Sequence, residues 1–212
     1  MKTGRSILMI VIASAWLGAL DVVAADQASP AAKVGAPAPA FDVTDIQGHE
    51  YRLSNLKGKL VVLEWHNQGC PYVGKHYDSG NMQRLQKELT GQGVVWLTVI
   101  SSAPGKQGYV TPPEEEKYLK EKQAAPTAVV LDPDGKLGLL YGAKTTPHMF
   151  LIDEKGMLVY GGAIDDKPTH DPADIDGAKN YVLAAYQEVK AGKPVSVATT
   201  APYGCSVKYR DQ

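Results

Sequence analysis

Cysteine is scarce in this sequence, with Cys70 and Cys205 the two that occur among 212 residues. Two cysteines are too few for the disulfide network that holds small secreted domains together. The chain is instead long enough for one domain with a substantial hydrophobic core. Any sulfur chemistry must use these two positions.

An excess of charge of either sign is also missing. The chain has 22 Lys and Arg residues against 23 Asp and Glu residues, a formal net charge of −1. Binding to a phosphate backbone or to anionic lipid headgroups depends on a clear excess of basic residues. We therefore expect no nucleic-acid partner and no binding to a charged membrane surface.

The N-terminus has an apolar stretch that is too short for a good membrane span. It follows the basic residues Lys2 and Arg5, occupies residues 7–20 with polar Ser14 inside it, and precedes the small residues 23–25. This order is typical of a secretory signal peptide. The first 25 residues are thus predicted to be a signal peptide, the protein to be periplasmic or secreted, and any membrane contact to need the uncleaved segment.

The remaining chain is divided by composition. Residues 26–39 are rich in Ala and Pro and are interpreted as a linker. Residues 40–191 are predicted to form the folded domain, and residues 192–212 a C-terminal tail that carries Cys205 and can fold back over the domain.

Apolar periodicity within the domain predicts alternating strands and helices. A capping-box order at Thr111–Glu114 marks one helix start, and Asp171-Pro172 is interpreted as the start of the last helix. The predicted strands are 41–43, 50–53, 60–66, 94–100, 128–131, 149–152 and 158–160, and the predicted helices are 71–89 with an interruption at 78–81, 111–123, 137–141 and 172–191. The order describes an α/β, thioredoxin-like fold, in which helices flank a central mixed sheet, with an N-terminal β extension.

Cys70 stands at the junction between a strand and a helix. It follows the apolar run 60–66, and Pro71 at the first helical position marks the helix start. Unpaired N–H groups and the positive end of the helix dipole favour a thiolate there, which predicts a lowered pKa and fast alkylation. The alternative is a buried, inert cysteine.

Several segments together carry a resemblance to a known family. They are Gly35-Ala36-Pro37-Ala38-Pro39-Ala40-Phe41, Gly58-Lys59-Leu60-Val61-Val62-Leu63, Glu64-Trp65-His66-Asn67-Gln68-Gly69-Cys70-Pro71, Thr146-Pro147-His148-Met149-Phe150, and Gly204-Cys205-Ser206-Val207-Lys208-Tyr209. From about residue 35 to residue 209 the chain resembles the exported, peroxiredoxin-like branch of the AhpC/TSA (redoxin) proteins of the thioredoxin superfamily.

The resemblance implies roles for individual residues. Cys70 takes the place of the nucleophilic cysteine of C-x-x-C, and Pro147 the place of the cis-proline that faces it. Glu64 takes the place of a buried acidic group that assists proton transfer, although Val73 stands where the second cysteine would be. An acidic residue inside an apolar strand is costly unless it is hydrogen-bonded or neutral, so a perturbed pKa is expected, unless Glu64 points to water.

Four residues next to these positions are expected to contact a substrate: Thr146, His148, Pro71 and Trp65. A cis Thr146–Pro147 bond would present the Thr146 backbone to an extended substrate segment beside the sulfur.

Two other readings remain open beside exchange chemistry. A thiol-dependent peroxidase would use Pro-x-x-x-Thr/Ser-x-x-Cys, but here Leu63 and Asn67 occupy the proline and hydroxyl positions. The second alternative is a non-catalytic binding module or a metal-handling protein. His66 and His148, near Cys70, would be the candidate metal ligands. No metal site and no cofactor are predicted, and His49, His76 and His170 are expected at the surface.

The predicted function is thiol–disulfide exchange through Cys70. Cys205 is a distal partner that either resolves an intermediate during turnover or forms a structural bond. The expected partners are an exported thiol or disulfide protein or a small oxidant, together with an electron donor that the sequence does not identify.

Overall fold

The structure is a computed structural model that describes Met1 and residues 32–211. The predicted signal peptide and residues 26–31 of the predicted linker lie outside the described residues. In chain order the elements are β1 (Asp42–Thr44), β2 (Glu50–Arg52), η1 (Leu53–Leu56), β3 (Val61–Trp65), α1 (Pro71–Asp78), α2 (Asn81–Gly91), β4 (Val95–Ile100), α3 (Pro112–Lys122), β5 (Ala128–Leu131), α4 (Lys136–Tyr141), β6 (Thr145–Thr146), β7 (His148–Ile152), β8 (Leu158–Gly162), η2 (Pro172–Asp174), α5 (Tyr181–Lys190) and β9 (Cys205–Ser206).

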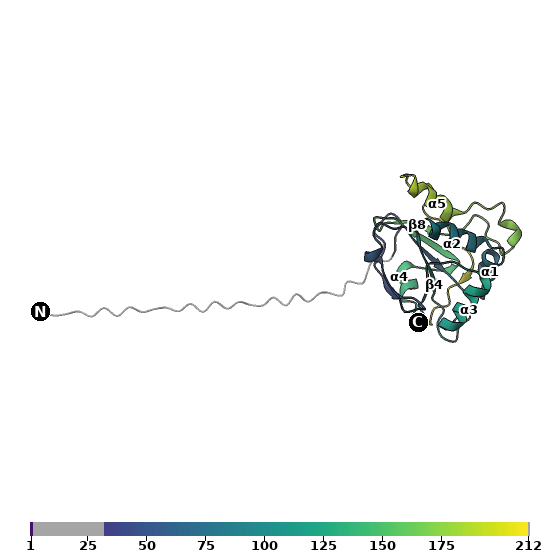
Figure 1. Cartoon of the computed structure of the whole chain (residues 1–212), viewed down its shortest axis with the longest axis horizontal. Coiled ribbons are helices and arrows are strands. Elements are labelled where there is room, and N and C mark those ends of the chain that lie inside the picture. The colour runs from purple at the N-terminus through teal and green to yellow at the C-terminus, as the bar shows by residue number, and fades with distance from the viewer. Residues whose placement is uncertain (2–31, 212) are drawn as a thin grey trace.

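A five-stranded mixed sheet with the order β5-β4-β3-β7-β8 forms the centre of the domain (Figure 1). β3, β4 and β5 run parallel, whereas β7 is antiparallel to β3 and β8 is antiparallel to β7. All residues of β3, β4 and β7 are buried, as expected for strands covered on both faces. The predicted α/β, thioredoxin-like fold is confirmed.

Side chains alternate between the two faces of β3, and this separates two hydrophobic clusters. Val62 packs with α1, α2 and α5 in the cluster that also contains Cys70. Val61, Leu63 and Trp65 pack on the other face, against α4 and the N-terminal hairpin. The thiol and the hairpin therefore belong to opposite sides of the sheet.

Two local signals in the sequence are confirmed. The first helix is interrupted where expected, between α1 and α2, at Gly80 with φ of 73°. α3 begins with the predicted capping box, in which Glu114 accepts from the backbone N–H of Thr111 at 2.8 Å.

The prediction of a linker through residue 39 is wrong for residues 32–39, which lie on the domain. The Gly35 N–H donates to Leu158 O at 2.8 Å, and the Leu158 N–H donates to Ala36 O at 2.9 Å. Pro39 O accepts from Tyr141 Oη at 2.8 Å. The Ala- and Pro-rich composition did not reveal this because backbone groups make these bonds.

The last helix begins later than predicted. Asp171 caps only the short turn η2, and α5 starts at Tyr181, where the side chain of Asn180 accepts from the Leu183 N–H at 2.8 Å. Between them Gly177, exposed, interrupts the apolar spacing that suggested one continuous helix. Gly costs about 1 kcal/mol within a helix, and the better cap at Asn180 fixes the start.

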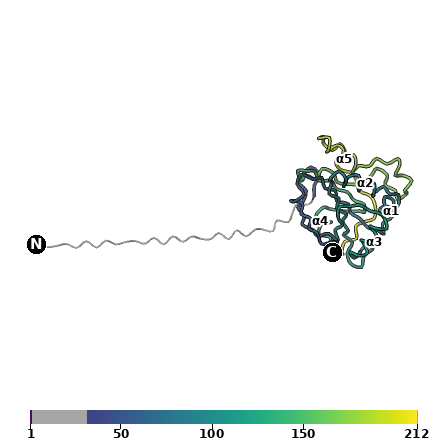
Figure 2. The backbone as a smooth tube through the Cα atoms, viewed as in Figure 1, coloured from purple at the N-terminus to yellow at the C-terminus, as the bar shows by residue number. Residues whose placement is uncertain are grey.

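The C-terminal segment returns across the molecule after α5. Figure 2 traces it in yellow from α5 past α1 to the far end. It contributes β9, which pairs antiparallel with β6. Among the described residues, none of the helices is both long and apolar enough to traverse a lipid bilayer.

Candidate functional site

Cys70 caps the N-terminus of α1 directly after the loop that follows β3. Its backbone is extended (φ −88°, ψ 122°), and Pro71 begins the helix, as the sequence predicted. The Cys70 side chain is only 1% exposed, whereas Pro71 lies exposed beside it. The Cys70 thiol donates to the backbone oxygen of Thr146 at 3.1 Å.

The predicted cis peptide bond between Thr146 and Pro147 is confirmed. Thr146, just before it, belongs to β6, and the partner of β6 is β9 of the same chain. In this pairing Thr146 stands opposite Cys205, and Thr145 stands opposite Ser206. The backbone expected to receive a substrate segment is therefore occupied by the protein's own C-terminal segment.

The pairing brings the two cysteines into contact. Both are free thiols, Cys70 buried and Cys205 partly exposed, and Cys205 packs against the hydrophobic cluster that contains Cys70. Gly204 allows the close approach, because a Cβ there would clash with the Thr146 carbonyl group and its φ of 132° is unfavourable for other residues.

The two thiols are electrostatically unequal. Burial raises the pKa of Cys70, but interaction with Cys205 and a hydrogen bond from the Val73 backbone N–H outweigh it, so the Cys70 pKa lies below its ordinary value. Burial and the neighbouring Cys70 raise the pKa of Cys205 to about 11. Of the two sulfurs, Cys70 therefore loses its proton more readily than Cys205.

Tyr203 anchors the segment two residues before Cys205. Its hydroxyl donates to Oδ1 of Asp165, which is 2% exposed. Lys75 of α1 lies beneath, with Nζ 3.4 Å from Asp165 Oδ2 and 5.5 Å from the centre of the Tyr203 ring. Lys75 Nζ also donates to Lys167 O at 2.7 Å. A buried ion pair thus holds the tyrosine, and we call Tyr203, Asp165 and Lys75 the latch.

The segment is also fixed after Cys205. The Val207 N–H donates to Lys144 O at 3.0 Å, and Lys208 O accepts from the Ala103 N–H at 2.8 Å. Tyr209 Oη donates to Ala143 O at 2.8 Å. Contacts on both sides of Cys205 therefore keep it at Cys70.

Glu64 is buried in β3 and does not point to water. Its carboxylate accepts from Tyr77 Oη and Trp96 Nε1, both at 2.8 Å, and from Gln86 Nε2 and Thr98 Oγ1, both at 3.1 Å. Burial raises its pKa, but the nearby His66 ring (3.7 Å) and these donors outweigh it and lower the pKa below the ordinary value. Glu64 is thus an ionised, fully hydrogen-bonded centre of the core.

A second buried carboxylate, Glu115 of α3, was not found from the sequence. Within residues 32–211 neither of its oxygens, nor either ring nitrogen of His66, has a hydrogen-bond partner. Burial raises the Glu115 pKa, and His66 partly offsets this. Nothing in the helix pattern marked it, because its neighbours Glu114 and Glu116 are ordinary exposed positions.

The other predicted contact residues have different surroundings. His148 is 6% exposed, its Nδ1 accepts from the Lys144 N–H at 3.2 Å, and it lines a groove of about 840 Å³ beneath residues 199–202. Trp65 is wholly buried on the opposite face of the sheet, where its Nε1 donates to Ser101 Oγ at 3.0 Å. This corrects the prediction of a substrate contact for Trp65, because strand alternation turns it away from Cys70.

Asn67, at the hydroxyl position of the peroxidase motif, is used to shape the loop. Its Oδ1 accepts from the Gly69 N–H at 2.9 Å, and its Nδ2 donates to Gln107 Oε1 at 2.9 Å. The Asn67 amide thus hydrogen-bonds within the loop, and it has no hydroxyl group like the one that the peroxidase motif places near the thiol.

The histidines form no metal site within residues 32–211, where no three side chains of His, Cys, Asp or Glu cluster suitably. His49 and His170 are exposed as predicted. His76 is fully buried, which corrects its prediction as a surface residue. Its Nδ1 accepts from Asn81 Nδ2 at 2.8 Å, and its Nε2 lies 3.8 Å from Asp165 Oδ2.

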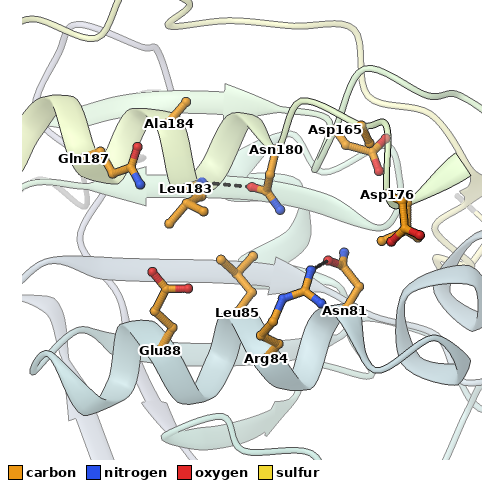
Figure 3. A pocket seen from close by; sticks show the side chains of 12 residues that line it. Asn81, Arg84, Leu85, Glu88, Asp165, Asp176, Asn180, Leu183, Ala184 and Gln187 are labelled. Atoms are coloured by element: carbon orange, nitrogen blue, oxygen red, sulfur yellow. Dashed lines mark hydrogen bonds between the residues drawn. The ribbon is translucent and has the colours of Figure 1, made fainter.

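A separate polar cavity of about 350 Å³ lies between α2 and α5 (Figure 3). Arg84 projects from α2 and hydrogen-bonds to Asn81, and Asn180 caps α5 on the other side. Asp165 lies at one end, so the latch and this cavity share a carboxylate.

The AhpC/TSA family is matched over residues 34–161, more than half of the chain. The chain belongs to the AhpC/TSA family. It is 31% identical over 126 residues to the thiol-disulfide oxidoreductase ResA of Geobacillus kaustophilus, covering 59% of this chain and 67% of that protein. It is 30% identical over 142 residues to the thiol:disulfide interchange protein DsbE of Pseudomonas aeruginosa, covering 65% and 72%.

Solved structures support the fold of this AhpC/TSA protein. An uncharacterized conserved protein from Geobacillus kaustophilus superposes with a TM-score of 0.73 at 24% identity, covering 87% of this chain and 96% of that one. A putative thioredoxin from Neisseria meningitidis superposes with a TM-score of 0.52 at 21% identity, covering 74% of this chain and 89% of that one. The family match ends before residues 192–211, so the segment with Cys205 is additional to it.

Proposed function

We propose that this protein is a thiol–disulfide oxidoreductase whose redox pair is Cys70 and Cys205. The observation that carries the proposal is that both cysteines adjoin Thr146, whose carbonyl accepts from the Cys70 thiol and whose strand pairs with Cys205. The curated relatives named as thiol–disulfide oxidoreductases support the same chemistry. The pair would replace the local C-x-x-C disulfide that Val73 rules out.

In this reaction Cys70 is the low-pKa sulfur of the pair. A thiolate of the reduced pair attacks a sulfur in a partner disulfide and expels the partner's other sulfur as a thiolate, and the second sulfur of the pair then displaces the partner and closes the Cys70–Cys205 bond. Oxidation of the pair removes two electrons and two protons and transfers the electrons to a partner disulfide, and the reverse reaction oxidises a partner dithiol. Partner proteins with thiols or disulfides are therefore the proposed substrates.

We also propose that the protein acts outside the cytoplasm, in the periplasm or after secretion. The support is the sequence of residues 1–25 and the need for a compartment in which a disulfide can persist.

A redox titration tests the function. The protein is equilibrated in thiol–disulfide buffers, quenched with acid and mapped after alkylation. We expect one two-electron transition between two free thiols and a Cys70–Cys205 bridge, at a potential in the range of about −120 to −270 mV that exchange proteins span.

Cys205→Ser should abolish the two-electron transition, and Ser206→Ala, one residue along the same strand, should leave it unchanged. A bridge that is reduced only after denaturation would make the bond structural and would contradict turnover. Two thiols that remain free in every buffer would contradict the redox pair itself.

A further inference from the structure

We propose that partner proteins exchange disulfides with this protein through Cys205, and that Cys70 reacts only inside the molecule. This inference rests on the proposed function and adds which of the two cysteines forms the mixed disulfide with a partner. It reverses the order expected from the sequence, in which Cys70 would meet the partner first.

Access is the first reason. Cys70 is 1% exposed and is covered by the segment that carries Cys205, while Cys205 is partly exposed and is followed by the exposed Ser206. An attacking thiolate must reach one sulfur of a disulfide from the side away from the other sulfur. For a Cys70–Cys205 bridge the open side is at Cys205, because protein surrounds Cys70.

The occupied strand is the second reason. A partner segment that pairs with Thr146 beside Cys70 would need the place that Cys205 already occupies. The latch at Tyr203 holds the segment before Cys205, and the bonds of Val207 and Lys208 hold it after Cys205. A partner that displaced β9 would have to break all of these contacts before any sulfur chemistry.

The leaving groups point the same way. Attack on Cys205 expels Cys70, whose thiolate the Val73 N–H at the start of α1 stabilises, and a better stabilised thiolate leaves faster. Attack on Cys70 would expel Cys205, whose pKa burial raises. The chain therefore favours bond cleavage that leaves the negative charge on Cys70.

A partner dithiol is oxidised in two successive displacements. A partner thiolate forms a bond to Cys205 Sγ, the Cys70–Cys205 bond breaks, and Cys70 leaves with the electron pair. The second thiolate of the partner then attacks the partner's sulfur in the mixed disulfide, the partner's own S–S bond forms, and Cys205 leaves as a thiolate. The partner dithiol loses two electrons, and the Cys70–Cys205 bridge gains them and becomes two thiols, each of which takes its proton from water.

A trapping experiment tests the entry point. The oxidised full-length protein is mixed with a thioredoxin that retains only its nucleophilic cysteine, and the reaction is quenched early with acid because Cys70 can reverse it. Free thiols are then alkylated and the trapped complex is mapped by mass spectrometry. We expect the thioredoxin on the Cys205 peptide at least ten times more often than on the Cys70 peptide, with Cys70 alkylated.

The outcomes separate the two proposals. A bridge that forms but carries the thioredoxin on Cys70, or that gives no adduct on either sulfur, overturns the entry through Cys205 and leaves the redox pair standing. A protein in which no bridge forms overturns the proposed function. Ser206→Ala is the matched control and should keep the adduct on Cys205.

Discussion

Burial changes what single residues can do in this protein. Cys70 has the lowered pKa that its place at a helix start implies, yet its side chain is covered. Thiolate character without access gives slow reaction with external reagents. We therefore expect slow alkylation of Cys70 by external reagents in the folded protein, in place of the fast alkylation that the sequence predicts.

Two buried histidines supply a prediction about pH. Burial lowers the pKa of His76 to about 4, with Asp165 opposing and Lys75 assisting, and burial with the nearby Lys144 lowers the pKa of His148 to about 4. Since histidine in an unfolded chain titrates near 6.5, the unfolded state binds more protons between these values. The free energy of unfolding should fall as pH drops from 6.5 to 4, by about 3 kcal/mol for each histidine at 1.36 kcal/mol per pKa unit.

Urea unfolding at several pH values, together with NMR titration of the imidazoles, measures this effect. His148→Asn should flatten the dependence on pH, whereas His170→Gln, at an exposed position, should leave it unchanged. Imidazole midpoints near 6.5 for His76 and His148 in the folded protein would refute the explanation.

At the scale of elements, the two-residue strand β9 determines where Cys205 lies. It completes a pairing with β6 and brings Cys205 to Cys70, while the latch fixes its approach. The latch depends on a hydroxyl that donates to a buried carboxylate, and a hydrogen bond of this kind contributes about 1.5–3 kcal/mol.

Tyr203→Phe should loosen this segment without removing the ring. In a Cys205→Ser background we expect the rate of Cys70 alkylation by iodoacetamide at pH 7 to rise roughly ten- to hundredfold, because the loss of about 1.5–3 kcal/mol increases the open population. Tyr109→Phe, which removes a hydroxyl at an exposed position, is the control. An alkylation rate unchanged by Tyr203→Phe would show that the latch does not govern access.

At the scale of the whole molecule, the redox pair needs an oxidising location. The sequence of residues 1–25 predicts export, and the family relationship is compatible with a thiol protein that works there. We expect cell fractionation to recover the protein outside the cytoplasm. Its intact mass should correspond to a chain that begins at Asp26.

A replacement that breaks the apolar stretch, such as Leu17→Arg, should retain the full-length form inside the cell. A protein found inside the cytoplasm with Met1 intact would refute export, while the contact between Cys70 and Cys205 would be unaffected.

The sequence by itself determined the order of the central strands and the helices, and the helix start at Cys70. These features rest on local patterns, namely apolar periodicity and capping residues, whereas the cis-proline segment was implied by the resemblance to the AhpC/TSA proteins. It also identified Cys205 as the remaining sulfur, but local patterns do not set the distance between residues far apart in the chain.

Tertiary structure decided which groups meet. The pairing of β9 with β6, the latch of Tyr203 on Asp165 and Lys75, and the burial of Glu115 and His76 all join distant segments. Trp65 turned out to face the opposite cluster because a strand sends alternate residues to alternate faces, and the packing of helices selects which face holds the thiol. The accessible sulfur was likewise decided by the fold, because exposure depends on what the rest of the chain covers.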